Sequence, residues 1–176
     1  LMPSTEIENL DKFRMTRQHI NNYNSNYAPI NKDFKYFSDK LNAKMAQRIA
    51  HITIVVKDYD EAIKFYTERL NFELLEDTRL SEVKRWVIVA PQGDLSCSLL
   101  LAKSDSEEQR SKIGNQTGGR VFLFLYTDNF ERDYKNLIGN RVEIVREPRI
   151  EEYGKVLVFS DLYGNLWDLI EPLKRN

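Results

Sequence analysis

One order of hydrophobic patterns occurs twice in this chain, and it restricts the fold more than any other feature. A strand-like run is followed by a helical run and then by three more strand-like runs, and the order repeats about 71 residues later. In the first copy the runs are 49–56, 58–70, 72–80, 83–91 and 96–103, and in the second 121–127, 128–140, 142–148, 155–161 and 165–172. Because the two copies share few identical residues, the repeat is one of element order. It predicts an α+β chain built of two βαβββ modules.

Local signals mark the ends of these elements. Asp58 with Glu61 three residues later forms a capping box that predicts where the first helix begins. Asn71 follows the same helix, at a place that favours a residue tolerant of positive φ. The run DLYGN at 161–165 is typical of a turn between the last two strands.

The chain divides into regions of different composition. We interpret residues 1–44, rich in Asn, Asp, Lys and Ser, as an N-terminal extension with two short amphipathic runs. It is either a non-native appendage or an arm that packs on the domain or on a partner. The patterned domain is predicted at 45–172, with module 1 at 48–103, a linker at 104–119 and module 2 at 120–172. A polar tail follows at 173–176.

Composition excludes several classes of protein. The 176 residues carry a formal net charge of −1, without the basic excess of a nucleic-acid-binding protein. Cys97 is the single cysteine, so neither an intrachain disulfide nor a cysteine-based zinc finger can form. No apolar run reaches the length of a membrane span. We therefore expect a cytoplasmic protein with no nucleic-acid and no membrane partner.

Two segments resemble a known family. HITIVVKDYDEAIKFYTERLNFEL, from His51, and FSDLYGNLWDLIEP, ending at Pro172, resemble the vicinal oxygen chelate superfamily. This superfamily contains glyoxalase I, bleomycin-resistance proteins and extradiol dioxygenases. The resemblance implies that paired modules form a cup-shaped mixed sheet, the glyoxalase/bleomycin-resistance/dioxygenase fold.

The same resemblance implies one divalent metal ion, held by residues on the first and last strands of each module. Two of those positions carry metal-binding side chains, His51 and Asp168. A third falls on Phe122, or on Val121 if the register slips by one, and neither binds metal. The fourth falls within 97–101, where Cys97 is the one candidate. Facing each other, His51 and Asp168 could instead form an acid–base pair without metal.

Six further side chains are candidates for contact with a small molecule. Arg85 would bind an anionic group, and Trp86 lies on the opposite face of the same strand. Each candidate also has a plain alternative as a core, loop or surface residue. The predicted substrate-binding set is Arg85, Trp86, Gln116, Phe122, Tyr153 and Trp167.

Two functions from different classes fit these residues. The first is a glyoxalase- or dioxygenase-like isomerase or lyase, metal-assisted or acid–base, acting at His51 and Asp168 on a small molecule with vicinal oxygens. The second is a non-catalytic small-molecule binder of the antibiotic-sequestering type. The resemblance further implies a homodimer, with modules paired within one chain or across two.

Overall fold

The computed structural model describes residues 48–93 and 97–173, which belong to one compact unit that spans 48–176. The N-terminal extension at 1–44 lies outside the described residues, so its interpretation and the predicted domain boundaries stay predictions. Among the residues that the structure describes, no helix is long and apolar enough to cross a membrane.

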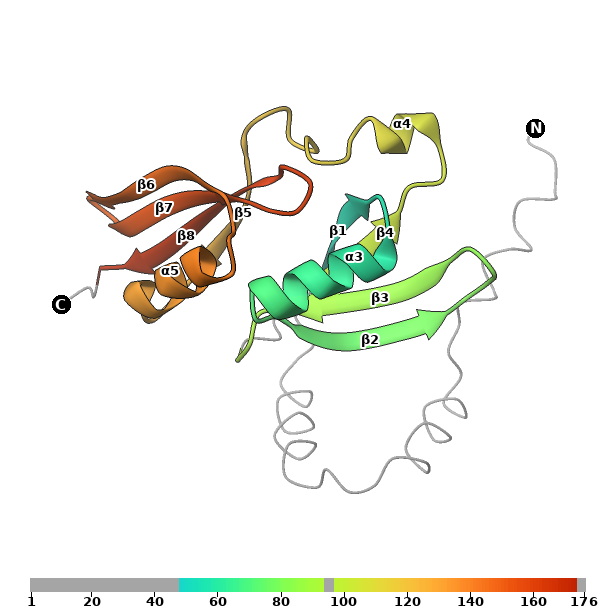
Figure 1. Ribbon diagram of the computed structural model, residues 1–176, viewed down its shortest axis with the longest axis horizontal. Helices are drawn as coiled ribbons and strands as arrows, with labels where there is room; N and C mark the ends of the chain where they lie inside the picture. The colour runs from blue at the N-terminus through green and yellow to red at the C-terminus, as the bar shows by residue number, and fades with distance from the viewer. Residues whose placement is uncertain (1–47, 94–96, 174–176) are drawn as a thin grey trace, which may run out of the picture. The chain divides into compact units, whose positions relative to one another are not determined.

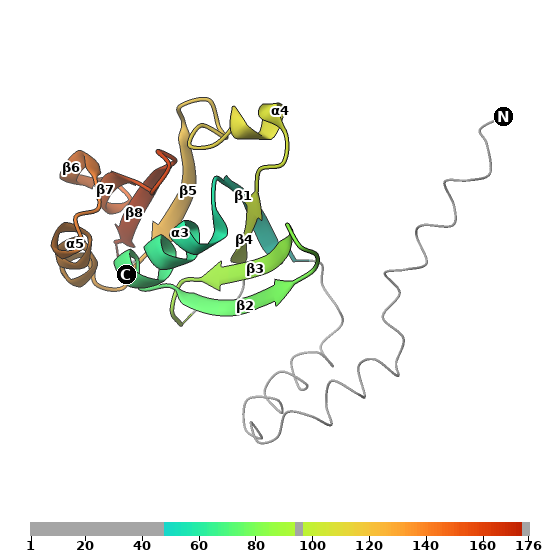
Figure 2. The same cartoon turned by 45° about the vertical axis from the view of Figure 1, so that its right-hand side comes forward.

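The fold consists of two four-stranded mixed sheets, one from each predicted module (Figures 1 and 2). Sheet A has the order β1-β4-β3-β2 and sheet B the order β5-β8-β7-β6. In each sheet the first and last strands of the module pair in parallel, and the other pairs are antiparallel. The strands are β1 (His51–Val56), β2 (Glu73–Arg79), β3 (Arg85–Ala90), β4 (Ser98–Lys103), β5 (Val121–Tyr126), β6 (Ile144–Glu151), β7 (Gly154–Ser160) and β8 (Leu166–Pro172). The predicted fold class and element order are confirmed.

One helix follows the first strand of each module. In module 1 it is α3 (Tyr59–Lys64), which continues as the π-helical turn η2 (Phe65–Arg69), and in module 2 it is α5 (Phe130–Gly139). The side chain of Asp58 accepts hydrogen bonds from the backbone N–H groups of Asp60 and Glu61, as predicted for a helix N-cap. A short helix, α4 (Glu107–Arg110), lies in the linker.

The two helices differ in length by one residue, which explains the π-helical turn. From the N-cap to the residue with positive φ that ends the helix, module 1 runs from Asp58 to Asn71 and module 2 from Asn129 to Arg141. Asn71 has φ 57°, as its position in the sequence predicts. Module 1 has one residue more within this interval. Its helix accommodates that residue as the π-helical turn η2, in which hydrogen bonds join residues five apart instead of four.

The modules share one hydrophobic core, formed by the helix-bearing face of each sheet. Trp167 on β8 is 2% exposed and stacks on Phe159, with ring centroids 5.7 Å apart. It also contacts Tyr66 and Phe72 of module 1, at centroid distances of 6.2 and 6.0 Å. Aromatic packing of this kind stabilises the contact between modules beyond the area it buries.

A buried polar cluster joins the modules beside this core. The Tyr66 hydroxyl donates to Asp161 Oδ2 over 2.8 Å. The same carboxylate accepts from the Asn165 side chain and from the backbone N–H groups of Tyr163 and Asn165. The DLYGN run is therefore a turn, as predicted, and its buried carboxylate also holds a tyrosine of the other module. Burial and the Asp161 charge raise the pKa of Tyr66 well above its usual range.

Candidate functional site

Each sheet has a second face, which lies opposite the helices and which we call its open face. On β1 and β4 the residues Ile54, Val56, Leu99 and Leu101 belong to the core, so the alternate residues of these strands lie on the open face. The open face of sheet A carries His51, Thr53, Trp86, Ile88, Ser98 and Leu100. The open face of sheet B carries Phe124, Tyr126, Arg146, Arg149, Val156, Val158, Asp168 and Ile170.

His51 lies at the start of β1 with its imidazole on the open face of sheet A. Its Nδ1 is 2.6 Å from the hydroxyl oxygen of Ser98, its register partner on β4. Its ring meets Trp86 edge to face, with centroids 6.1 Å apart and planes at 85°. These contacts hold the imidazole beside an aromatic surface, and they show that Ser98, not Cys97, is the β4 residue opposite His51.

Asp168 lies on β8 at the middle of the open face of sheet B. Its side chain is 9% exposed, and its Oδ1 atom is buried without a hydrogen-bond partner. Burial raises the pKa of this carboxyl, while the positive charges of Arg149 and Arg146 act in the opposite direction. A buried acceptor without a donor destabilises the folded state. A ligand that donates a hydrogen bond to Asp168 would remove this cost.

Aromatic residues flank Asp168 at the outer strand of sheet B. Phe124 on β5 is its register partner and is 59% exposed, and Tyr126, two residues along, is 67% exposed. Arg146 and Arg149 on β6 occupy the other side of the same face. The open face of sheet B therefore carries aromatic rings on β5, a carboxylate on the neighbouring strand β8 and two guanidinium groups on the far strand β6.

The donor set does not fit the predicted metal ion. Among the residues that the structure describes, no three His, Cys, Asp or Glu side chains lie close enough together to hold one. The strand partner of His51 is Ser98 and that of Asp168 is Phe124, so neither residue has a second metal-binding side chain directly beside it on the paired strand. No hydrogen bond joins His51 to Asp168 within the described ranges.

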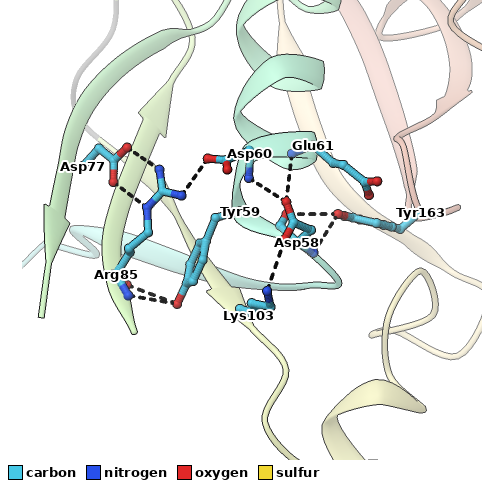
Figure 3. A network of polar contacts seen from close by, with 8 residues as sticks. All are labelled: Asp58, Tyr59, Asp60, Glu61, Asp77, Arg85, Lys103 and Tyr163. Carbon is cyan, nitrogen blue, oxygen red and sulfur yellow. Dashed lines mark hydrogen bonds and ion pairs between the residues drawn. The ribbon is translucent and has the colours of Figure 1, made fainter. Parts of the chain in front are cut away.

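Arg85 lies on the α3 side of sheet A, where Figure 3 shows it beside Tyr59, Asp60 and Asp77. Its guanidinium pairs with Asp77 and Asp60 and stands over the ring of Tyr59, 5.2 Å from the centroid. The hydroxyl of Tyr59 in turn contacts the backbone of Arg85. The strand alternation that separates Arg85 from Trp86 thus puts the arginine on the α3 side, within a network of ion pairs. A ligand on the Trp86 face would not contact it.

The other predicted ligand-binding residues are dispersed. Trp167 is in the core, and Phe122 packs against the core next to a register shift between Val121 and Leu123. Gln116 accepts a hydrogen bond from the backbone N–H of Val55 on β1 over 2.6 Å. Tyr153 is 54% exposed, beside the turn between β6 and β7. Phe124 replaces Phe122 on the open face because of that register shift, which strand alternation in VFLFLY could not reveal, since residues 122 and 124 have the same parity.

A cleft of about 1290 Å³ lies on the helix side, between α5 and the segments at 70–73 and 91–93. Its polar rim is already hydrogen-bonded across the modules. The Asn71 side chain donates to Asn136, and the side chains of Asn136 and Asn140 donate to the Arg69 carbonyl. We regard this cleft as part of the contact between modules, because asparagine side chains on its rim form hydrogen bonds across it.

The raised pKa of Asp168 predicts how the free energy of unfolding depends on pH. The folded state holds the Asp168 proton more tightly than the unfolded chain, so the free energy of unfolding falls as pH rises through the raised folded pKa. We expect Asp168→Asn to be more stable than the wild type by about 1 kcal/mol at neutral pH. The difference should narrow as pH falls toward about 4, the pKa of the unfolded carboxyl, because protonation removes the buried charge. Thermal unfolding of both proteins between pH 3.5 and 8 measures this, and a pH-independent difference would contradict it.

Comparison with known proteins identifies the family. The profile of the Glyoxalase/Bleomycin resistance protein/Dioxygenase superfamily matches residues 48–169. A protein of Shewanella frigidimarina (strain NCIMB 400) is 56% identical over 128 residues, which cover 72% of this chain and 95% of that protein. The chain belongs to the Glyoxalase/Bleomycin resistance protein/Dioxygenase superfamily.

Two solved structures are also similar. UcmS2 is 32% identical with a TM-score of 0.64, and the match covers 72% of this chain and 99% of that one. TnmS3, an antibiotic-binding protein from Streptomyces sp. CB03234, is 28% identical with a TM-score of 0.59, over 73% of this chain and 98% of that one. One of these two similar structures is therefore that of an antibiotic-binding protein.

Proposed function

We propose that this chain is a small-molecule-binding protein that holds a planar aromatic ligand with hydrogen-bond donors and leaves it chemically unchanged. The observation that carries this proposal is the buried, unpartnered Oδ1 of Asp168 next to the exposed ring of Phe124. A hydroxyl or amide donor on the ligand would satisfy the carboxylate, while the ring would stack on the phenylalanine.

Two further features support binding. Arg146 and Arg149, across the same face, would donate hydrogen bonds to carbonyl oxygens of a polar ligand. The similarity to the antibiotic-binding protein TnmS3 also favours a binder over an enzyme. The isomerase or lyase hypothesis requires His51 and Asp168 at one reacting group, and within one copy of the chain they lie on different sheets that share no strand pairing.

We propose that a second copy of the chain completes the site. Among the described strands, β1 pairs with β4 alone and β5 pairs with β8 alone, so each has an outer edge without a strand partner, and on the outer edge of β1 the Val55 N–H is bonded to Gln116. Edge strands of this kind favour pairing with another chain. Pairing of β1 with β5 of the second copy would bring the open faces of sheets A and B together. Sedimentation velocity tests the homodimer, and a monomer at micromolar concentration would contradict it.

The binding experiment uses a ligand pair that differs in donors alone. We expect 2,3-dihydroxynaphthalene to bind the full chain more tightly than 2,3-dimethoxynaphthalene, because the latter has no donor for Asp168. In titrations by calorimetry, Phe124→Ala should weaken binding of the diol about tenfold, the scale of one lost aromatic contact. Asp168→Asn should reduce the preference for the diol.

Ile138→Ala is the matched control, since Ile138 is 51% exposed on α5 and lies off both open faces. That variant should bind as the wild type does. Mass spectrometry of the recovered ligand should show no product after prolonged incubation. A product whose formation depends on His51 would establish an enzyme instead, and equal loss of binding in the Ile138 and Phe124 variants would count against the open face.

A further inference from the structure

The contact between His51 and Ser98 can be oriented from the other partner of the serine hydroxyl. Ser98 is 5% exposed, and its hydroxyl oxygen is 2.6 Å from His51 Nδ1 and 3.4 Å from the backbone carbonyl oxygen of Ala50. A serine hydroxyl has one proton to donate. The carbonyl of Ala50 can only accept, whereas a neutral imidazole nitrogen either donates or accepts.

Only one assignment of protons makes both contacts hydrogen bonds. If the Ser98 hydroxyl donates to Ala50, its oxygen accepts from His51, and the imidazole proton must lie on Nδ1. The opposite tautomer, with the proton on Nε2, would leave the contact between Ser98 and Ala50 without a proton. The nitrogen that remains, Nε2, then carries a lone pair.

We infer that Ser98 fixes His51 in the Nδ1–H tautomer, so that His51 Nε2 is a hydrogen-bond acceptor on the open face of sheet A. His51 is exposed, and no hydrogen bond of Nε2 to another residue is present in the described part of the chain. Trp86 stands at the edge of the same imidazole. Ser98 is thus a positioning residue, and the acceptor that it creates selects the ligand.

This inference deepens the proposed function, on which its ligand class rests. An aromatic ring packed against Trp86 and carrying a hydroxyl group would place that hydroxyl at Nε2. A ring with a carbonyl or ether oxygen at the same point would meet a lone pair and be rejected. Both open faces therefore offer acceptors, Asp168 on sheet B and His51 on sheet A, and the ligand class is a polyhydroxylated aromatic.

The tautomer is measured directly and without any ligand. The chain contains two histidines, His19 and His51, so a long-range ¹H–¹⁵N spectrum of the full ¹⁵N-labelled chain contains two imidazole patterns, and His19→Gln assigns them. At about pH 8.5, where ordinary imidazoles are neutral, His51 should show the Nδ1–H pattern. Ser98→Ala should change it to the Nε2–H pattern, while Ser98→Thr, which keeps the hydroxyl, should not. An Nε2–H pattern in the wild type, or no change in Ser98→Ala, would overturn the inference.

The proposed ligand selectivity is tested separately, by binding measurements. Ser98→Ala should weaken binding of 2,3-dihydroxynaphthalene about 3- to 10-fold, the scale of one hydrogen bond, and should strengthen binding of 2,3-dimethoxynaphthalene, whose ether oxygen would then meet an N–H group. Equal weakening of both compounds would overturn the proposed selectivity. If neither compound binds the wild type, the proposed function and the ligand class fail together, and the spectrum still decides whether Ser98 fixes the tautomer.

Discussion

Asp161→Ala is expected to lower the free energy of unfolding by about 3–5 kcal/mol, because four donors converge on that buried carboxylate. Asp161 is 5% exposed. Its removal would leave the Tyr66 hydroxyl and the Asn165 amide without an acceptor at the contact between the modules. Chemical denaturation monitored by tryptophan fluorescence measures the loss, because Trp167 lies in the same region of the core.

Tyr66→Phe is the control for this prediction. It removes one of the four hydrogen bonds and keeps the aromatic packing on Phe72 and Trp167, so a loss of about 1 kcal/mol is expected. If Asp161→Ala cost no more than Tyr66→Phe, the carboxylate would not organise the turn as the structure indicates.

Gly114→Ala is expected to destabilise the chain by about 2–4 kcal/mol, through a clash between the linker and the last turn. A Cβ at Gly114 would overlap the carbonyl oxygen of Tyr163 and lie 2.8 Å from its carbonyl carbon. Both atoms are backbone, so relief requires the linker or the 161–165 turn to move. Gly114 also has φ +74°, which an L-residue adopts at a cost.

Gly118→Ala separates the cost of the steric clash from the cost of the positive φ. Gly118 has a similar φ of +66°, but a Cβ there would meet nothing within 4 Å. Its substitution should lower the free energy of unfolding by about 1 kcal/mol, which is the cost of a positive φ in an L-residue without any clash. The difference in unfolding free energy between the two variants measures the clash. Equal losses would mean that the linker is not held against the turn.

Local signals were sufficient to predict the elements. Asp58 and Glu61 predicted the start of α3, Asn71 its end, and the 161–165 run a turn, because capping and left-handed conformations depend on neighbours in sequence. Strand alternation predicted that Arg85 and Trp86 lie on opposite faces of β3, and the structure agrees. The double βαβββ order followed from the same periodicities.

The candidate site could not be predicted from neighbours in sequence, because it depends on strand register and on contacts between the modules. Phe122 was expected on the ligand side, yet a register shift in β5 puts Phe124 opposite Asp168. Trp167 was expected to contact a ligand, yet its neighbours in the core are aromatic residues of the other module. Cys97 was the expected β4 residue, and Ser98 holds that place. A displacement of one residue moves a side chain to the other face of a sheet, and sequence alone does not fix register to that precision.

The sequence by itself determined that this chain forms two βαβββ modules, because helix and strand periodicities and capping residues act within a few neighbours. Only the tertiary structure decided that His51 and Asp168 lie on separate sheets, that Ser98 orients His51, and that an oxygen of Asp168 has no partner. Those facts depend on strand pairing between residues far apart in the chain, and on which sheet face the other module covers.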